Sequence, residues 1–137
     1  MSNIYNLDIL CDEQVRAVVD SNIECDPTAV ALKRGVPPAQ VVATQIKYLQ
    51  RARRKLPSWY ASRCIIPPRA FEQSSSEESA ERKPLAGESC LDLTCGLGVD
   101  SMALARRFGR VVAIERDQDL AEVVRYNMAL MGVDNVE

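Results

Sequence analysis

Apolar residues recur at helical spacing through the first half of the chain. The longest such pattern, in PPAQVVATQIKYLQRARRKLPSW, predicts a helix from Pro38 to Lys55 that Pro57 ends. Two earlier patterns each follow an acid that can cap a helix, Asp12 in one case and Asp26 in the other. These features predict a small domain of helices at the start of the chain.

The pattern changes near residue 89. Two short apolar runs, CLDL and RVVAIE, are typical of buried strands, and each precedes a helical pattern, DSMALARRF and DQDLAEVVRYNMALMG. Strands that alternate with helices predict an α/β fold with a parallel sheet and a right-handed crossover. The final MGVDNVE stands where a third strand would begin, so we expect the sequence to be the N-terminal piece of a longer protein.

The segments between these halves carry weaker signals. RCIIPPRAFEQ is expected to be irregular, because Pro67 and Pro68 oppose a helix. In the polar QSSSEESAERKPLAG, Ser75 and Glu78 form a capping-box pattern, which favours a short ordered helix over a flexible linker. The expected organisation is a helical, basic N-terminal domain at 1–72, a connecting helix or linker at 73–88, and the start of an α/β domain at 89–137.

A glycine loop and an acid flank the helix that follows the first predicted strand. Gly96 and Gly98 permit a tight turn and a close approach of the backbone to a ligand. Glu115 ends the second predicted strand, where its carboxylate can accept hydrogen bonds from two ribose hydroxyls. This arrangement predicts a nucleoside site. In the plainer alternative the loop is a bare strand–helix turn, and Asp100 caps the helix.

Two cofactor classes compete for such a site. A dinucleotide-binding loop has a third glycine, and Ser101 stands at that position here. Asp100 would repel a pyrophosphate, whereas Asp100 and Asp92 together suit a ligand that carries positive charge. The residues therefore favour S-adenosylmethionine, which has a cationic sulfonium and no phosphate, over NAD.

The stretches DLTCGLGVDSMALA and VVAIERDQDLAEVVRYNMALMGV resemble motif I and the following acidic motif of class I S-adenosylmethionine-dependent methyltransferases. With the upstream segments ARRKLPSWYA and SSSEESA, the chain is most similar to the THUMP-like and trimethylguanosine-synthase-like RNA methyltransferases of Bacteroidetes. The resemblance implies the first βαβα part of a Rossmann-like methyltransferase sheet, truncated in this chain. It also implies an enzyme that methylates a guanine N2-type amine of tRNA or rRNA.

The same resemblance implies where catalysis and cofactor binding reside. The family's catalytic motif follows the fourth strand, so no catalytic residue is expected in this chain, which we expect to be inactive alone. Glu115 would hold the ribose, and Asp92 would face the methionine amino group. Arg116 and Asp117 would lie near the adenine. Ser75 and Ser76 would close over the methionine part. The expected cofactor-binding residues are Asp92, Gly96, Gly98, Asp100, Ser101, Glu115, Arg116, Ser75 and Ser76.

The net charge of −2 hides an uneven distribution, because residues 27–71 carry nine bases and no acid. Four of these bases share one face of the long predicted helix and a tryptophan follows, which suits phosphate contacts and base stacking. The alternative is a solvated helix end with the tryptophan in the core. The predicted nucleic-acid-binding residues are Lys47, Arg51, Arg54, Lys55 and Trp59, and the expected partner is tRNA or rRNA.

The remaining composition argues against several classes of protein. Five cysteines without a C-x-x-C pair, and no histidine, predict no metal site. An odd number of cysteines and no signal peptide indicate reduced thiols and a cytoplasmic protein. No apolar stretch is long enough for a membrane span.

Two alternatives to an RNA methyltransferase stay open. A non-catalytic RNA-binding module would keep the basic helix beside a relict nucleotide fold. A methyltransferase for small molecules or proteins would share the glycine loop but would not need the basic helix. Because two strands alone leave exposed sheet edges, we also expect the isolated piece to self-associate.

Overall fold

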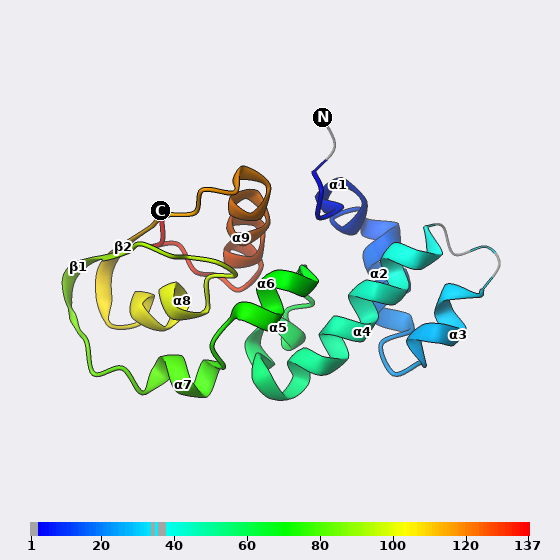
Figure 1. Cartoon of the computed structure of the whole chain (residues 1–137), viewed down its shortest axis with the longest axis horizontal. Helices are drawn as coiled ribbons and strands as arrows, with labels where there is room; N and C mark the ends of the chain where they lie inside the picture. The colour runs from blue at the N-terminus through cyan, green and yellow to red at the C-terminus, as the bar shows by residue number, and fades with distance from the viewer. Residues whose placement is uncertain (1–2, 34, 36–37) are drawn as a thin grey trace.

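The structure of the chain is a computed structural model that describes residues 3–33, 35 and 38–137. Helices fill the N-terminal part, and two parallel strands with their helices form the C-terminal part (Figure 1). This order confirms the α/β class that the alternation predicted. The N-terminal helices are α1 (Leu7–Leu10), α2 (Glu13–Ser21), α3 (Pro27–Ala31), α4 (Ala39–Lys55), α5 (Pro57–Ala61), α6 (Pro68–Gln73) and α7 (Glu77–Glu81). They precede β1 (Gly87–Asp92), α8 (Val99–Ala105), β2 (Phe108–Ala113) and α9 (Gln118–Leu130).

Helix α4 is the centre of the helical part. Its N-cap is Pro38, so the predicted start of the long helix is confirmed to within one residue, and its predicted end is confirmed. Val42, Ile46 and Leu49 are fully buried on one face, and α4 packs against α2, α3 and α5. Because burying each such side chain is worth ~1.5–3 kcal/mol relative to leaving it exposed, this face holds the helical part together.

The predicted caps of the two earlier helices are confirmed. Asp12 Oδ1 accepts hydrogen bonds from the backbone nitrogens of Gln14 at 2.9 Å and Val15 at 3.1 Å. Asp26 Oδ1 accepts one from the backbone nitrogen of Thr28 at 3.1 Å. These bonds satisfy N–H groups that have no partner inside the helix, so each helix begins where its acid stands.

The polar connection folds as helix α7, but the predicted cap is wrong by one residue. Ser76, not Ser75, is the N-cap, and its Oγ accepts a hydrogen bond from the backbone nitrogen of Ser79 at 3.1 Å. The next residue, Glu77, is buried, and its carboxylate accepts from the backbone nitrogen and hydroxyl of Ser58 at 2.6 and 2.7 Å. A buried carboxylate needs such partners, so Glu77 sets where α7 begins.

The strands β1 and β2 pair in parallel, with Cys90 opposite Val111. Each begins two or three residues before the apolar run that predicted it. The first three residues of β1 are exposed and carry no apolar signal, whereas Phe108, the first residue of β2, belongs to the helical pattern that precedes it. On the other edge of β2, the backbone nitrogen of Val111 donates to the Asn135 carbonyl and its carbonyl accepts from the Glu137 nitrogen, both at 2.8 Å. Residues 135–137 thus pair where a third strand was expected.

Helix α9 joins the two parts of the chain. Asn127 is fully buried; its side-chain amide donates to the Ile65 carbonyl and accepts from the Ile65 nitrogen, both at 2.8 Å. Val123 of the same helix packs against Leu10 and Ile65. In Figure 1, α6 and α9 lie between helices α1 to α4 and the strand pair. The helical and α/β parts therefore share buried contacts.

One face of the strand pair carries exposed apolar side chains. Leu91, Leu93 and Ile114 expose 55%, 67% and 47% of their surface. Leu91 belongs to β1, whereas Leu93 and Ile114 follow the last residues of β1 and β2. The prediction that CLDL forms a buried strand is therefore wrong, because its two leucines are exposed. The expected self-association of the chain stays a prediction. Within the described ranges, no helix has the length and apolar character needed to cross a membrane.

Candidate cofactor-binding site

A cavity of about 780 Å³ lies where the ends of β1, β2 and α6 meet. Open α/β sheets bind ligands at this place, beyond the carboxyl ends of their strands. The volume is within the range of about 300–1,000 Å³ that is usual for small-molecule sites. The lining consists of Tyr5, residues 69–70, 73–75, 93–97, 99–100 and 114–117, and Leu120.

Glu115 is fixed in the wall of this cavity by backbone groups. Its Oε2 accepts a hydrogen bond from the nitrogen of Gly96, and its Oε1 accepts one from the nitrogen of Asp117, both at 3.0 Å. A carboxylate oxygen has room for more than one hydrogen bond, so both oxygens can still accept from a ligand. The carboxylate is therefore oriented in advance toward a partner that carries hydroxyl groups.

The two loop glycines have different roles. Gly96 has a φ of +55°, and a Cβ built on it would meet no atom within 4 Å, because the backbone there borders the cavity. Gly98 has a φ of +88°, and its Cβ would lie 2.7 Å from Met128 Cε and 3.1 Å from Val124 Cγ1. Gly96 thus leaves space for a ligand, whereas Gly98 leaves space for helix α9.

The carboxylate of Asp92 is held by the residues that follow it. One oxygen accepts from the backbone nitrogen of Thr94 at 3.1 Å, and the other accepts from the hydroxyl of Ser101 at 2.6 Å. Ser101 is fully buried. A serine at the position of the third glycine therefore supplies a partner for the strand carboxylate. Neither side chain belongs to the lining of the cavity.

The other predicted cofactor-binding residues are divided between the cavity and its surroundings. Asp100, Arg116 and Ser75 belong to the lining, whereas Ser76 caps α7. Asp100 also forms an ion pair with Lys83 at 2.7 Å, which reduces the negative charge that it presents to a ligand. The structure therefore brings Gly96, Asp100, Glu115, Arg116 and Ser75 together around one cavity.

Tyr5 is a lining residue that sequence reasoning missed. Its hydroxyl donates a hydrogen bond to Asp117 Oδ2 at 2.5 Å. Partial burial and this hydrogen bond, together with the nearby negative charges, raise the pKa of Tyr5 to about 12. The hydrogen bond from Tyr5 also lowers the pKa of Asp117. No local pattern could indicate a contact between residues 112 positions apart in the sequence.

Helix α6 supplies a second part of the wall, and its presence overturns the expected irregular segment. Pro68 is the first residue of the helix, where its missing N–H costs nothing. Ala70 and Phe71 are buried. Arg69 and Gln73, four residues apart on another face of the helix, line the cavity. The proline at N1 was the signal that could have predicted this helix.

Two buried cysteines, one of them in the cavity lining, are poor nucleophiles. Burial raises the pKa of Cys95, in the glycine loop, to about 11, and that of Cys64 to about 12. Both thiols therefore stay protonated at neutral pH. All five cysteines lie in the described part of the chain and are free thiols. Across that part, no group of three or more potential metal ligands gathers in one place.

The proposed nucleic-acid face on α4 is only partly free. Arg51 forms an ion pair with Glu72 at 2.5 Å, and Lys55 Nζ donates to the Phe71 carbonyl at 2.7 Å. Trp59 is fully buried in the main apolar cluster, so its predicted role as a stacking platform for RNA bases is wrong and the core alternative is confirmed. The sequence around it, LPSWYASR, mixes apolar and polar residues and did not reveal which side of α5 faces inward.

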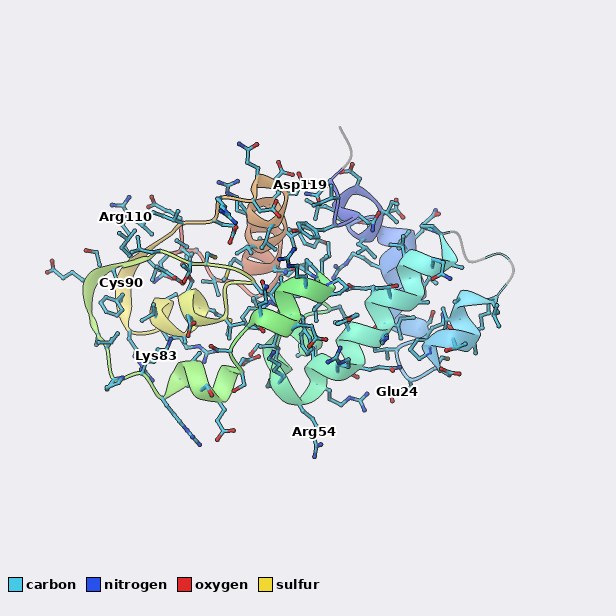
Figure 2. All side chains as sticks on the ribbon, in the orientation of Figure 1. Glu24, Arg54, Lys83, Cys90, Arg110 and Asp119 are labelled. Atoms are coloured by element: carbon cyan, nitrogen blue, oxygen red, sulfur yellow. The ribbon has the colours of Figure 1, made fainter. Side chains whose placement is uncertain are left out.

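Lys47 and Arg54 remain exposed on α4. Figure 2 shows Arg54 pointing away from the ribbon at the surface of the molecule. Lys47 lies over the ring of Tyr48, at 5.9 Å from its centroid, which leaves its charge at the surface. Among the described residues, Arg51 is held by an ion pair and Lys55 by a hydrogen bond, so Lys47 and Arg54 are the bases of the predicted face that can reach a partner without breaking either kind of contact.

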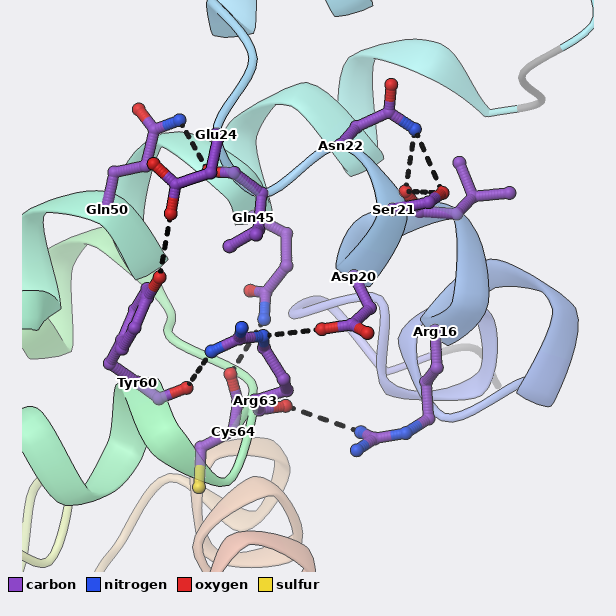
Figure 3. Close-up of polar contacts among 12 residues, drawn as sticks. Arg16, Asp20, Ser21, Asn22, Glu24, Gln45, Gln50, Tyr60, Arg63 and Cys64 are labelled. Atoms are coloured by element: carbon purple, nitrogen blue, oxygen red, sulfur yellow. Dashed lines mark hydrogen bonds and ion pairs between the residues drawn. The ribbon is translucent and has the colours of Figure 1, made fainter.

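Other bases of the middle segment are held by acids of the first 26 residues. Arg63 Nε donates to Asp20 at 2.9 Å, and the Arg63 carbonyl accepts from Arg16 at 3.4 Å (Figure 3). Arg53 forms an ion pair with Glu24, which also accepts from the Tyr60 hydroxyl at 3.3 Å. The uneven charge along the sequence is therefore partly compensated in the fold.

A parallel strand pair, a glycine loop between strand and helix, and an acid after the second strand define the start of a Rossmann-like fold. No protein-family model matches the chain. A 23S rRNA (uracil(1939)-C(5))-methyltransferase of Hahella chejuensis is 42% identical over 55 residues, which is 40% of this chain and 12% of the relative. The corresponding enzyme of Vibrio parahaemolyticus is 27% identical over 135 residues, which is 98% of this chain and 30% of the relative.

A solved structure gives the same indication. The crystal structure of a protein from Porphyromonas gingivalis W83, assigned as a methyltransferase, is 31% identical and has a TM-score of 0.77. The match covers 92% of this chain and 35% of that one, so it includes the helical part as well as the glycine loop. The chain thus spans between about an eighth and a third of the length of the proteins it matches.

These comparisons support the resemblance to class I methyltransferases. They do not support the THUMP-like and trimethylguanosine-synthase-like subfamily. The relatives from Hahella chejuensis and Vibrio parahaemolyticus are both named for methylation of the C5 atom of uracil. A tRNA/tmRNA (uracil-C(5))-methyltransferase of Photobacterium profundum, 45% identical over 47 residues (34% of this chain and 13% of the relative), has the same base in its name.

Proposed function

We propose that this chain supplies the cofactor site and part of the RNA-binding surface of an S-adenosylmethionine-dependent RNA methyltransferase. The observation that carries the proposal is the carboxylate of Glu115, held by the Gly96 nitrogen at the wall of a cavity of about 780 Å³. The space that a Cβ of Gly96 would occupy is empty, so a ligand can approach the backbone there.

The chemistry of the lining fits S-adenosylmethionine at each of its parts. Glu115 can accept from the ribose hydroxyls, and Asp100 can face a cationic group. Arg69 adds a guanidinium to the lining, which suits the carboxylate of the methionine part. Asp92 and Ser101 do not contact the cofactor in this proposal. They support the glycine loop through the hydrogen bond between their side chains.

The bound cofactor supplies a methyl group on a positively charged sulfur. The residues of this chain bind and orient that group, and positioning is a large part of what such a transfer needs. Activation of the acceptor base is not assigned to any residue of this chain. The protonated thiols of Cys64 and Cys95 do not suit that role at neutral pH.

The proposed substrate is RNA, and two acceptor atoms are to be distinguished. Uracil C5 is the atom in the names of the curated relatives, and the guanine N2 amine is the one implied by the resemblance of the sequence. Incubation of the full-length gene product with tRNA or rRNA, followed by nucleoside mass spectrometry, separates the two, since 5-methyluridine and N2-methylguanosine differ in mass. Methylation of a protein or a small molecule, and not of RNA, would contradict the proposal.

Isothermal titration calorimetry on the 137-residue chain tests the cofactor class. We expect S-adenosylhomocysteine to bind and NAD not to bind, because the lining has acids and no third glycine for a pyrophosphate. RNA binding without any nucleoside binding would favour the non-catalytic RNA-binding module. Preference for NAD would overturn the assignment.

A further inference from the structure

We propose that Tyr5 forms the adenine-side wall of the cofactor site, so that the N-terminal segment is part of that site. The inference rests on the proposed function, because it takes the ligand to be an adenosine. It adds a binding residue from a part of the chain that lies far from the glycine loop in the sequence.

The N-terminal segment is pinned to the start of helix α9. The backbone nitrogen of Ile4 donates to Asp119 Oδ2 at 2.8 Å, and the buried side chain of Asn3 donates to the Asp119 carbonyl at 3.1 Å. Asn3 Oδ1 also accepts from the Tyr5 nitrogen at 2.9 Å. Figure 2 labels Asp119 at the end of α9 that lies beside the N-terminal segment. These bonds fix the backbone that carries the Tyr5 side chain.

Tyr5 is connected to the proposed ribose acid by a short chain of hydrogen bonds. Its hydroxyl donates to Asp117 at 2.5 Å, and the nitrogen of Asp117 donates to Glu115 at 3.0 Å. The other carboxylate oxygen of Asp117 accepts from the Leu120 nitrogen at 3.2 Å. Tyr5 therefore has a fixed position next to the part of the cavity that holds the ribose in the proposed function.

In this proposal the ring of Tyr5 is the part that contacts the ligand, because the hydroxyl proton is engaged by Asp117. The hydroxyl is engaged by Asp117, whereas the residue lines the large cavity and also a second cavity of about 270 Å³ beside Ile66 and Pro67. A flat aromatic ring at the edge of a nucleoside site suits stacking on a base. The adenine and the methionine part are attached at opposite ends of the ribose. The proposed function places the cationic methionine part at Asp100, so the adenine is the part directed toward Tyr5.

Two ligands and three variants test this role in the full chain. 5′-Methylthioadenosine has the adenosine of S-adenosylhomocysteine but lacks the amino-acid part. We expect Tyr5→Ala to weaken calorimetric binding of both ligands by the same factor, roughly tenfold or more. Tyr5→Phe keeps the ring, and its loss of log affinity should be less than half of the loss in Tyr5→Ala. Tyr126→Phe, which removes a hydroxyl that accepts from Arg16 elsewhere in the chain, is the matched control and should bind as the unaltered chain does.

The outcomes separate this inference from the proposed function. Binding of both ligands to folded Tyr5→Ala with unchanged affinity would overturn the role of Tyr5 and leave the proposed function intact. Equal losses of affinity in Tyr5→Phe and Tyr5→Ala would assign the effect to the hydrogen bond between Tyr5 and Asp117. That result would also overturn the proposed stacking of the ring on the adenine. Failure of the unaltered chain to bind either ligand removes both proposals. If Tyr5→Ala does not fold, hydrogen exchange of the unaltered chain decides, because ligand should protect residues 3–10 and unchanged exchange there contradicts the inference.

Discussion

The backbone nitrogen of Gly96 donates a hydrogen bond to the carboxylate of Glu115 at 3.0 Å, so the loop after β1 and the acid after β2 form one unit. The bond orients the acid before any ligand arrives. It also places the open side of Gly96 and the carboxylate at the same cavity. Ligand binding should therefore depend on this unit and on the residues that support it.

Alanine at each loop glycine should have a different effect. Both substitutions place a side chain at positive φ, which costs ~1–2 kcal/mol of folding free energy. Gly98→Ala should lose more folding free energy than Gly96→Ala, because the new Cβ at residue 98 would also clash with Met128 and Val124 of α9. Gly96→Ala should fold but lose binding of S-adenosylhomocysteine, because its Cβ enters the cavity. Urea denaturation and calorimetry on both variants check this, and equal stability losses with retained binding in Gly96→Ala would contradict it.

Ser101→Ala should destabilise the loop that carries the site. The substitution removes a buried hydroxyl that donates to Asp92 at 2.6 Å and leaves the carboxylate short of a partner. Removal of a hydrogen bond to a charged group costs ~1.5–3 kcal/mol in the free energy of unfolding. Ser101→Thr, which keeps a hydroxyl, is the comparison in urea denaturation. A change below ~0.5 kcal/mol in Ser101→Ala would show that the bond does not support the loop.

The bond between Tyr5 and Asp117 predicts a pH dependence at high pH. The pKa of Tyr5 rises from 10.0 to about 12 on folding, so the protonated phenol is favoured in the folded chain. The contribution of the Tyr5 hydroxyl to the free energy of unfolding is therefore complete below pH 10.0, and it is lost as the pH rises toward about 12. The difference in unfolding free energy between the unaltered chain and Tyr5→Phe should shrink over this range. A difference that stays constant from pH 9 to pH 12 would argue against the bond.

Reversal of the two free bases on α4 should weaken RNA binding. Lys47 and Arg54 are exposed, whereas Arg51 is engaged by Glu72. In Lys47→Glu/Arg54→Glu, affinity for tRNA should fall, and the slope of log affinity against log salt should become shallower by roughly one for each phosphate that the protein no longer neutralises. Arg82→Glu changes an exposed base at the C-cap of α7 and is the control for net charge. The double variant changes the net charge twice as much as the control does, so a loss of log affinity in the control that is half that of the double variant would show that the effect is one of net charge alone.

Local signals predicted much of the fold. The caps at Asp12 and Asp26 and the long helix α4 are confirmed, because each depends on residues within a few positions of one another. The strand starts were predicted too late. The first residues of β1 are exposed and show no apolar pattern, and Phe108 at the start of β2 continues the apolar spacing of the helix before it. The start of α7 is set by Glu77 and its contact with Ser58, which no local pattern contains.

The candidate site shows the same division. The glycine loop and Glu115 belong to one short motif, and the structure brings them together at the cavity. Tyr5 and Arg69 reach that cavity from the helical part, where their neighbours in the sequence give no sign of a ligand. Trp59 could be placed in the core only once the packing of α5 was known, because an aromatic beside a basic helix suits either role.

Calorimetric titration of S-adenosylhomocysteine into the chain and into Glu115→Gln tests the central claim most directly. The claim predicts binding to the unaltered chain and an affinity roughly ten- to a hundredfold lower in the variant, since a charged acceptor for the ribose hydroxyls is removed. Circular dichroism of both proteins confirms that each is folded. Equal affinity in the two folded proteins would contradict the assignment of this cavity to an adenosine cofactor.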